Sequence, residues 1–214
     1  MKMRSYYLGE LTWPDVKDFL TEHDVAIVPV GSCEQHGPHL PIDTDAYDAF
    51  WLSLKASEKA QCAIVALPLN YGVSLHHMDF PGTVTLSPHT LEQVAYEVVY
   101  SLTKHGFKKI LFENGHGGNT PALEAAVQRI KADTNAFVVI VGVPIQEMRD
   151  QNNVAIKYVT ANITFYEGTA GLRCIISNRI NYYPDGTFIK PNMPKRNVSI
   201  KQYVLLMKLY EAIR

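Results

Sequence analysis

The sequence predicts an α/β fold in which helices flank a mostly parallel central sheet. Between residues 25 and 143, short aliphatic runs alternate with segments of helical periodicity, as in units of strand, helix and strand. The aliphatic runs are apolar on both faces, which is typical of parallel strands covered on each side. Polar, glycine-rich loops follow the first and third runs, where such a sheet places its ligand sites.

The four aliphatic runs are the predicted strands. They span residues 25–30, 63–67, 110–112 and 137–143. The first predicted helix follows Asp43 and Thr44, which can cap its start, and it places apolar side chains at helical spacing from Ala46 to Leu54. Each predicted helix comes after a strand, so the connections are those of a parallel sheet.

Two further helices follow the same order. One begins after Ser87 and Pro88 and ends at Gly106, and the other spans residues 120–130 with Pro121 in its first turn. Beyond Pro144 the pattern weakens to a strand-like run at 172–176, a turn at 184–186 and an apolar helical stripe at 199–213. Because no internal repeat or linker interrupts the chain, we expect a single domain over residues 1–214.

Composition excludes several classes of partner. The 214 residues are 47% hydrophobic, which is enough for a substantial core, and 20 basic residues nearly balance 21 acidic ones. That balance provides no field for a nucleic acid or an anionic membrane, and no run approaches the roughly 20 apolar residues of a membrane span. The three cysteines form no CxxC pair. We therefore expect a cytoplasmic protein that acts on a small molecule.

Acidic and imidazole side chains gather in the two loops. Glu34, His36 and Asp45 follow the first predicted strand, and His116 follows the third. Because the carboxyl ends of parallel strands meet at one edge of a sheet, these loops can converge. Oxygen and imidazole ligands without thiolates suit zinc, manganese or iron(II), and a carboxylate can bridge two ions. The sequence thus predicts a hydrolytic metal centre.

Several neighbouring residues leave alternatives open. Asp43 competes with Asp45 as a ligand, although capping the helix would occupy it, and Asp45 could instead only favour the first helical turn. His39 either lines the pocket or lies outside it. Around His116, we expect Gly115, Gly117 and Gly118 to allow positive φ and close approach of the main chain. The more distant histidines are interpreted as structural or inert: His23, His89 and His105.

Residues 28–45, VPVGSCEQHGPHLPIDTD, resemble the metal-binding signature of the creatininase (creatinine amidohydrolase) family. Residues 11–14, 71–83 and 114–119 fit the same family pattern. The resemblance implies a layered α/β fold, a two-metal site, hydrolysis of a cyclic amide or a formamide, and a homo-oligomer such as a hexamer. Carried over by position, Glu34 and His36 each bind one ion, Asp45 bridges both, and His116 joins Glu34.

The same motifs imply a substrate pocket. His77 matches a family histidine of the pocket wall, where it can act in catalysis. The residues expected to contact substrate are His39, Ser74, His77, Gly117, Gly118 and Asn119.

The last ligand departs from the family pattern. Members that hydrolyse creatinine carry a glutamate two residues after the motif histidine, where this chain has Gly118. Other branches take the carboxylate from a later segment, and here Glu167 is the carboxylate nearest to that position. We expect Glu167 to complete the metal site. Either a water held between the ions and Glu167, or His77 across the pocket, would then transfer the proton to the leaving nitrogen.

The sequence leaves several substrates as alternatives. No histidine follows His116, so the imidazole that the later family segment supplies is missing, which argues against creatinine itself. A formamide hydrolase acting on a formylamino-pyrimidine ribose phosphate of flavin and deazaflavin biosynthesis is the preferred specific alternative. A peptidase-like member and a binding module that has lost catalysis are the other two.

Overall fold

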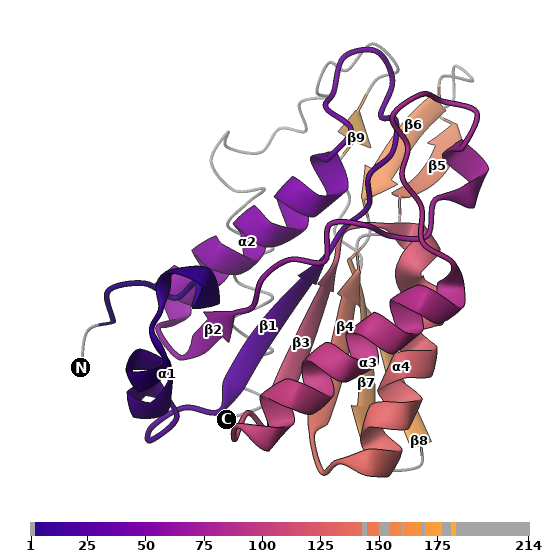
Figure 1. Cartoon of the computed structure of the whole chain (residues 1–214). Helices are drawn as coiled ribbons and strands as arrows, with labels where there is room; N and C mark the ends of the chain where they lie inside the picture. Colours follow the sequence, from indigo (N-terminus) through magenta and orange to yellow (C-terminus); the bar gives the residue numbers. More distant parts are fainter. Residues whose placement is uncertain are drawn as a thin grey trace.

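The computed structural model describes residues 3–142 and, beyond them, the backbone of five strand segments (Figure 1). Those segments are residues 145–149, 155–159, 161–167, 170–176 and 181–182. The predicted turn at 184–186 and the predicted helix at 199–213 lie outside the described residues. Among the described residues, no helix is both long enough and apolar enough to cross a bilayer.

A six-stranded sheet forms the centre of the molecule, in the order β2-β1-β3-β4-β7-β8. The first four strands are parallel, and β7 and β8 extend the sheet in antiparallel fashion. Their bounds are β1 Val25–Val30, β2 Ala63–Val65, β3 Lys109–Asn114, β4 Phe137–Gly142, β7 Ala161–Glu167 and β8 Ala170–Ile176. Three further strands pair separately in the order β5-β6-β9: Ile145–Arg149, Ala155–Val159 and Asn181–Tyr182.

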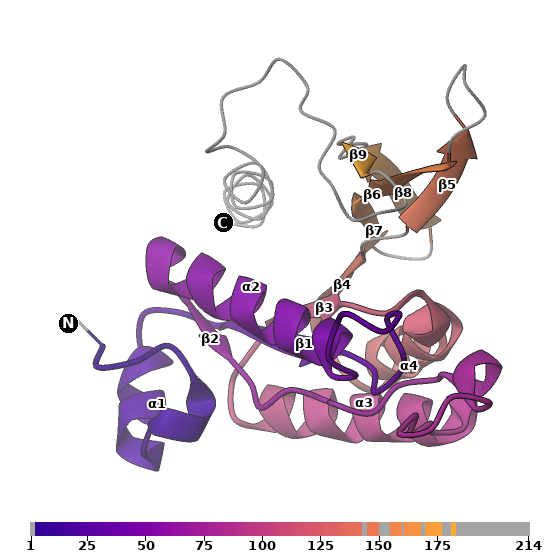
Figure 2. The same cartoon turned by 90° about the horizontal axis from the view of Figure 1, so that it is seen from above.

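Helices cover both faces of the parallel strands. Figure 2 shows α2 on one face, with α1, α3 and α4 on the other. The α-helices are α1 Trp13–Phe19, α2 Thr44–Ala60, α3 Pro88–Lys104 and α4 Thr120–Asp133, with short 3-10 turns η1 Leu8–Glu10, η2 Leu75–His77 and η3 Gly117–Asn119. Two buried clusters result, because β-strand side chains alternate between the faces. This layered arrangement confirms the predicted fold class.

Local sequence explains where the helices begin and end. Thr12 and Asp15 form a reciprocal capping box at the start of α1, and the Ser87 side chain accepts a hydrogen bond from the backbone of Thr90 at the start of α3. Past the end of α3, Gly106 has a φ of 111°, a conformation that favours glycine. Asp43 occupies the N-cap of α2, but its side chain makes no capping hydrogen bond, contrary to the expected cap.

Most predicted elements are present, with changed limits. Strand β3 extends to Asn114 rather than ending at Phe112, because Glu113 and Asn114 are buried polar residues that hide the pattern of a strand. Strand β2 stops at Val65. Helix α1 and the antiparallel strand β7 were not predicted, whereas the run at 172–176 lies within β8.

Candidate metal centre

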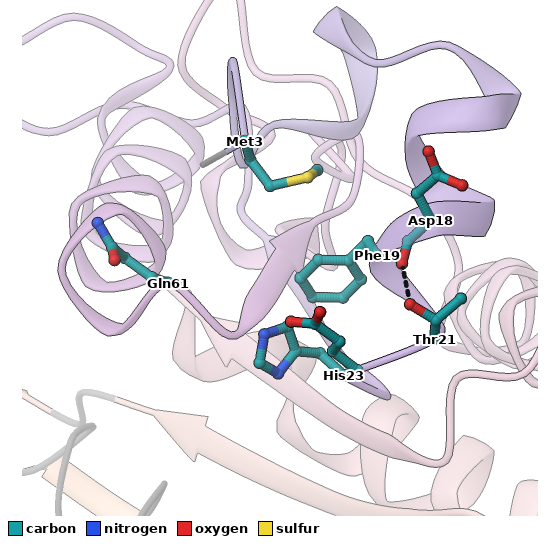
Figure 3. A pocket seen from close by; sticks show the side chains of 7 residues that line it. Met3, Asp18, Phe19, Thr21, His23 and Gln61 are labelled. Atoms are coloured by element: carbon teal, nitrogen blue, oxygen red, sulfur yellow. Dashed lines mark hydrogen bonds between the residues drawn. The ribbon is translucent and has the colours of Figure 1, made fainter. Parts of the chain in front are cut away.

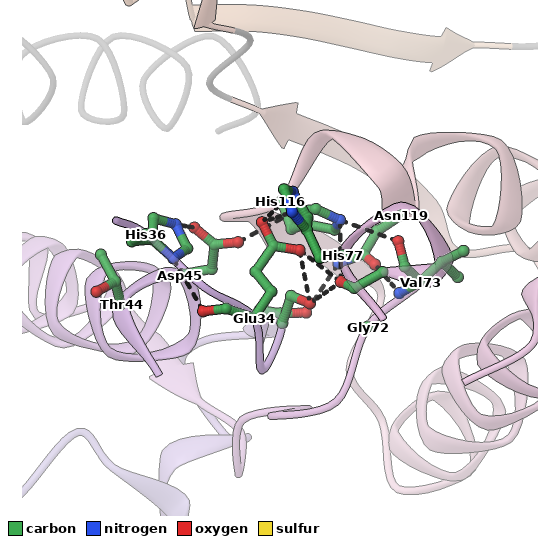
Figure 4. A network of polar contacts seen from close by, with 12 residues as sticks. Glu34, His36, Thr44, Asp45, Gly72, Val73, His77, His116 and Asn119 are labelled. Atoms are coloured by element: carbon green, nitrogen blue, oxygen red, sulfur yellow. Dashed lines mark hydrogen bonds and ion pairs between the residues drawn. The ribbon is translucent and has the colours of Figure 1, made fainter. Parts of the chain in front are cut away.

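Four predicted ligands meet at the carboxyl ends of β1 and β3 (Figure 4). Glu34 and His36 lie in the loop after β1, Asp45 lies in the first turn of α2, and His116 follows β3. Strands β1 and β3 are direct neighbours, with Val30 paired to Asn114. This pairing brings together two loops that are far apart in the sequence.

Asp45 lies between the two histidines and presents one oxygen to each. Its Oδ1 atom is 2.9 Å from Nε2 of His36, and its Oδ2 atom is 3.1 Å from Nδ1 of His116. The same His116 nitrogen lies 3.3 Å from Oε1 of Glu34. The carboxylate of Asp45 therefore lies between two groups of potential ligands: Glu34 and His116 on one side, and His36 on the other.

Backbone carbonyls hold the second nitrogen of each histidine. Nδ1 of His36 is 3.2 Å from the carbonyl oxygen of Glu34, and Nε2 of His116 is 3.0 Å from the carbonyl oxygen of Val73. A carbonyl only accepts, so each of these nitrogens carries a proton and donates it. In metal sites such outer hydrogen bonds fix the tautomer and the ring orientation. Here they turn Nε2 of His36 and Nδ1 of His116 toward the carboxylates.

Two serines orient the carboxylate of Glu34. Ser74 donates to Oε2 at 2.5 Å, and Ser32, which also contacts the Ser74 hydroxyl, lies 3.4 Å from the same oxygen. Both serines are fully buried. Ser74, which we predicted to bind substrate, is thus engaged with Glu34 and positions this carboxylate. Its effect is to leave Oε1 facing the histidines.

Of the two roles expected for the glycines of the His116 loop, the structure supports close approach of the main chain but not positive φ. Gly115, Gly117 and Gly118 are not among the positive-φ residues. A Cβ at Gly115 would overlap the carbonyl oxygen of Asp45, and one at Gly118 would overlap the carbonyl oxygen of Val73 and the His116 ring. Gly117 is exposed, and a Cβ at this position would meet open space. Close approach therefore accounts for the first and third glycines only.

Asn119 ties three segments together beneath the site. Its amide nitrogen donates to the carbonyl oxygen of Gly31 at 2.9 Å and to the side chain of Asn114 at 3.2 Å, and its oxygen accepts from the backbone of Val73 at 2.9 Å. The side chain is fully buried. We predicted that Asn119 binds substrate, but its amide is occupied by protein partners and has a positioning role.

Two adjacent histidines reach the cluster from the turn η2. Nε2 of His77 lies 3.6 Å from Oε1 of Glu34, and its Nδ1 lies 3.0 Å from the side-chain nitrogen of Gln35. The ring of His76 stacks on that of His116, with centroids 5.7 Å apart and planes 8° apart. Sequence analysis singled out His77 but missed His76, whose proximity depends on the path of the 71–83 loop.

Other predicted residues lie outside the cluster. His39 and Asp43 are exposed, and neither contacts the four ligands. Between the competing aspartates, the structure therefore places Asp45 in the cluster. In strand β7, Asn162 pairs with Gly142 at the end of β4, and Tyr166 pairs with Val138 near its start.

This register bears on Glu167, which directly follows Tyr166 in β7. Its backbone lies near the amino-terminal end of β4, whereas Glu34 and His116 lie at the opposite, carboxyl end of the parallel strands. Its side chain is outside the described part of the chain. The role of Glu167 as ligand or proton carrier stays a prediction, and the position of its backbone gives it no support.

The electrostatics of the cluster favour charged carboxylates. Burial alone would raise the pKa of Glu34 and Asp45, but the nearby His116, together with Ser74 at Glu34 and His36 at Asp45, lowers the pKa of both carboxyls below its ordinary value. The hydrogen bond to Asp45 raises the pKa of His36. Burial would lower the pKa of His116, but Asp45 and Glu34 raise it to about 10. Without metal, the two carboxylates are therefore charged and paired with the imidazoles of His36 and His116.

The donor set fits divalent ions. Two atoms that each lie about 2.1 Å from one ion are separated by about 3.0 Å in octahedral and about 3.4 Å in tetrahedral geometry. The separations from Asp45 to its two histidines and from Glu34 to His116 run from 2.9 to 3.3 Å. Moreover, Oδ2 of Asp45 is buried and accepts no hydrogen bond. Carboxylates and imidazoles at these spacings suit zinc, manganese or iron(II).

A hollow elsewhere on the surface offers no comparable set (Figure 3). Its volume is about 200 Å³, and it lies beside α1 and the segment that connects α1 to β1. It is lined by Met3, Asp18, Phe19, Thr21, Glu22, His23 and Gln61. Among the described residues, the groups close enough to share an ion are Glu34 with His76 and His116, and Glu34 with His36 and Asp45. Neither group includes a residue of this hollow.

The family follows from a match over most of the chain. The family model described as creatininase, creatinine amidohydrolase, matches residues 9–169, well over half of the sequence. The chain belongs to the creatininase family. The matched residues contain the whole of the Glu34, His36, Asp45 and His116 cluster.

Curated proteins with different names resemble the chain. It is 44% identical over 112 residues to the mycofactocin precursor peptide peptidase of Mycolicibacterium smegmatis, covering 50% of this chain and 45% of that protein. It is 30% identical over 123 residues to the creatinine amidohydrolase of Pseudomonas putida, covering 55% and 47%. The chain spans about half the length of these relatives.

A solved manganese form of creatininase resembles the fold of this family member. The TM-score is 0.62 at 26% sequence identity, and the match covers 65% of this chain and 58% of the other. Together with the family match, this agreement shows a creatininase-family hydrolase fold, whose sheet carries the ligand cluster described above.

Proposed function

We propose that the protein is a metal-dependent amidohydrolase that binds two divalent ions and cleaves a C–N bond of an amide. The position of Asp45 carries this proposal, because its two oxygens face histidines on opposite sides. Glu34 and His116 would hold one ion, His36 would hold the other, and Asp45 would contact both. Such ions, when bound, lower the pKa of a water toward neutrality and polarise the substrate carbonyl.

The protein side chains would hold charge and move a proton around the scissile bond. Glu34 and Asp45 keep the site anionic, and their serine and histidine partners hold them in place. His77 is half-buried and faces Glu34 across 3.6 Å. An imidazole at the edge of the cluster can donate a proton to the departing nitrogen, so we assign this role to His77.

The side chain of Gln35 supports that assignment. Its oxygen accepts from the backbone of Gly37 at 2.9 Å, which turns the amide nitrogen toward His77. That nitrogen donates to Nδ1, so the proton of a neutral His77 lies on Nε2, the nitrogen that faces Glu34. His77 thus presents a donor to the site.

The substrate we propose is a small cyclic amide or a formamide. The formamide arm has support from a 30% identity over 141 residues to a formylamino-ribosylaminopyrimidinone monophosphate deformylase of Methanothermus fervidus, covering 64% of this chain and 52% of that protein. Gly118 in place of the glutamate, and the absence of a later histidine, argue against creatinine.

A peptide amide is the second candidate. The similarity to the mycofactocin precursor peptide peptidase favours it, as do exposed apolar side chains beside the metal cluster. Leu75, Met78 and Phe80 flank His77 in one loop, and Leu40 and Ile42 lie in the loop that connects His36 to α2. Apolar groups at the mouth of a site can hold the side chains of a peptide.

Hydrolysis by metal-free and reconstituted protein tests the proposal. The purified chain would be stripped with a chelator, loaded with zinc, manganese or iron(II), and given lactams, creatinine, formamides and short apolar peptides, with products identified by mass. We expect hydrolysis of at least one class only after loading. Two bound ions without any hydrolysis would favour the binding module, and an unchanged rate after stripping would exclude metal dependence.

A further inference from the structure

We propose that His76 is a metal ligand and completes the coordination of the ion that Glu34 and His116 hold. This inference rests on the proposed two-metal site and extends it. One ligand atom each from Glu34, His76 and His116 can be chosen so that all three lie within 4.8 Å of one another. Together with Asp45, which would contact the same ion, two histidines and one glutamate would form a nitrogen and oxygen donor set of the kind that suits zinc, manganese or iron(II).

The turn η2 delivers His76 to this place. Ser74, the residue before this turn, donates a hydrogen bond to Oε2 of Glu34, and His77, the last residue of the turn, faces Oε1. His76 lies between them, with its ring nearly parallel to that of His116. Three residues of one short segment therefore lie close to the Glu34 carboxylate, and His76 is the one whose ring stacks on that of His116.

His76 has a ring nitrogen free for an ion. Among the described residues, neither of its nitrogens takes part in a hydrogen bond or an ion pair, and its contacts are with the rings of His77 and His116. Its side chain is exposed.

The other neighbours of this position are less suited to be ligands. Gly118 has no side-chain atom that could bind a metal. A side chain at this position would overlap the carbonyl oxygen of Val73, which accepts from Nε2 of His116. His77 keeps its proton on the nitrogen that faces Glu34, because Gln35 donates to the other one. Of these neighbours, His76 is therefore the one whose ring nitrogen is available to the ion that Glu34 and His116 would hold.

Phenylalanine at position 76 separates a ligand from a stacking partner. The substitution His76→Phe keeps an aromatic ring against His116 but removes the nitrogen, and His76→Glu restores a donor. His89→Phe is the matched control, since His89 has a side chain that is 83% exposed on α3, outside the cluster. Circular dichroism would check that each variant is folded.

Metal binding is the readout, measured by chelator competition and by the visible absorption of cobalt-substituted protein. We expect wild type and His89→Phe to bind two ions per chain. His76→Phe should bind one of them at least tenfold more weakly and shift the cobalt spectrum, and His76→Glu should recover much of the affinity.

The outcomes separate this inference from the proposed function. If His76→Phe binds both ions with the affinity and cobalt spectrum of the wild type, His76 only stacks on His116 and the inference is overturned, while the two-metal site stands. If wild-type protein itself binds no ions, the proposed function fails, and the assignment of His76 fails with it.

Discussion

Oδ2 of Asp45 lies 3.1 Å from Nδ1 of His116, although it is buried and accepts no hydrogen bond. A buried carboxylate oxygen without a donor is costly in a folded protein unless a cation or a ligand compensates it. On the opposite side, Oδ1 of the same carboxylate faces His36 at 2.9 Å. The relationship explains why Asp45 is the residue on which metal binding should depend most.

Substitution of Asp45 should therefore abolish function, whereas its neighbour Asp43 should tolerate the same change. Asp45→Asn removes the charge that faces both histidines, so we expect at least a hundredfold loss of hydrolysis and loss of bound metal. Asp43→Asn changes an exposed side chain that makes no capping bond. Metal content and rates would be compared for the two variants, and equal losses in both would contradict the assignment.

The two glycines that follow His116, Gly117 and Gly118, allow a matched test of the close-approach argument. Gly118→Ala places a methyl group against the carbonyl oxygen of Val73 and the ring of His116, so we expect a loss of about 1–3 kcal/mol in the free energy of unfolding. Gly117→Ala meets open space and should change stability by less than about 0.5 kcal/mol. Urea denaturation measures both, and similar values for the pair would refute the close-approach argument.

Removal of the Asn119 side chain should destabilise the loops beneath the site. Asn119→Ala leaves the backbone of Gly31 and Val73 without their partners, which should cost about 1–3 kcal/mol in the free energy of unfolding. Metal affinity should also fall, because Val73 holds His116 in place. Asn135→Ala, at an exposed position, is the control. Wild-type stability in Asn119→Ala would assign this side chain to the substrate instead.

The stability of the metal-free protein should depend on pH through His116. The pKa of His116 rises from 6.5 to about 10 on folding, so its contribution is complete below pH 6.5 and is lost as the pH rises toward 10. Glu34 and Asp45 have lowered pKa values, so their contribution is present above pH 4.5 and is lost as the pH falls.

Chemical denaturation of chelator-treated protein at pH 6.5, 8 and 10 measures this dependence. Unfolding free energy should fall across the series in wild type and much less in His116→Gln. Metal affinity should change in the opposite direction, because a ligating histidine must lose its proton. Equal pH slopes in the two proteins would show that His116 does not carry the effect.

The sequence was sufficient to predict the parallel half of the fold. Aliphatic runs and helical spacing mark β1, β4, α3 and α4 because these elements are buried on the faces that the pattern requires. The end of β3 was missed, since Glu113 is a carboxyl buried within a strand, where burial raises its pKa to about 8. Strand β7 was missed because a polar stretch precedes it and its pairing with β4 is not local.

Ligand types were predictable from sequence, but their supports were not. Acidic and imidazole residues in loops after strands indicated Glu34, His36, Asp45 and His116. A backbone carbonyl such as that of Val73 is present at every residue, so a residue pattern cannot indicate which one holds a histidine. The location of His76 depends on how the loop at 71–83 folds back. For the glycines, close approach was predicted correctly at Gly115 and Gly118, but positive φ was not, because the two requirements look alike in a sequence.

The most direct test of the two-metal centre is anomalous X-ray diffraction from crystals of the zinc-loaded protein, recorded on both sides of the zinc absorption edge. We expect two anomalous peaks that share the carboxylate of Asp45, one beside His36 and the other beside Glu34 and His116. Peaks confined to other parts of the surface, with the four side chains paired to one another as they are without metal, would contradict it.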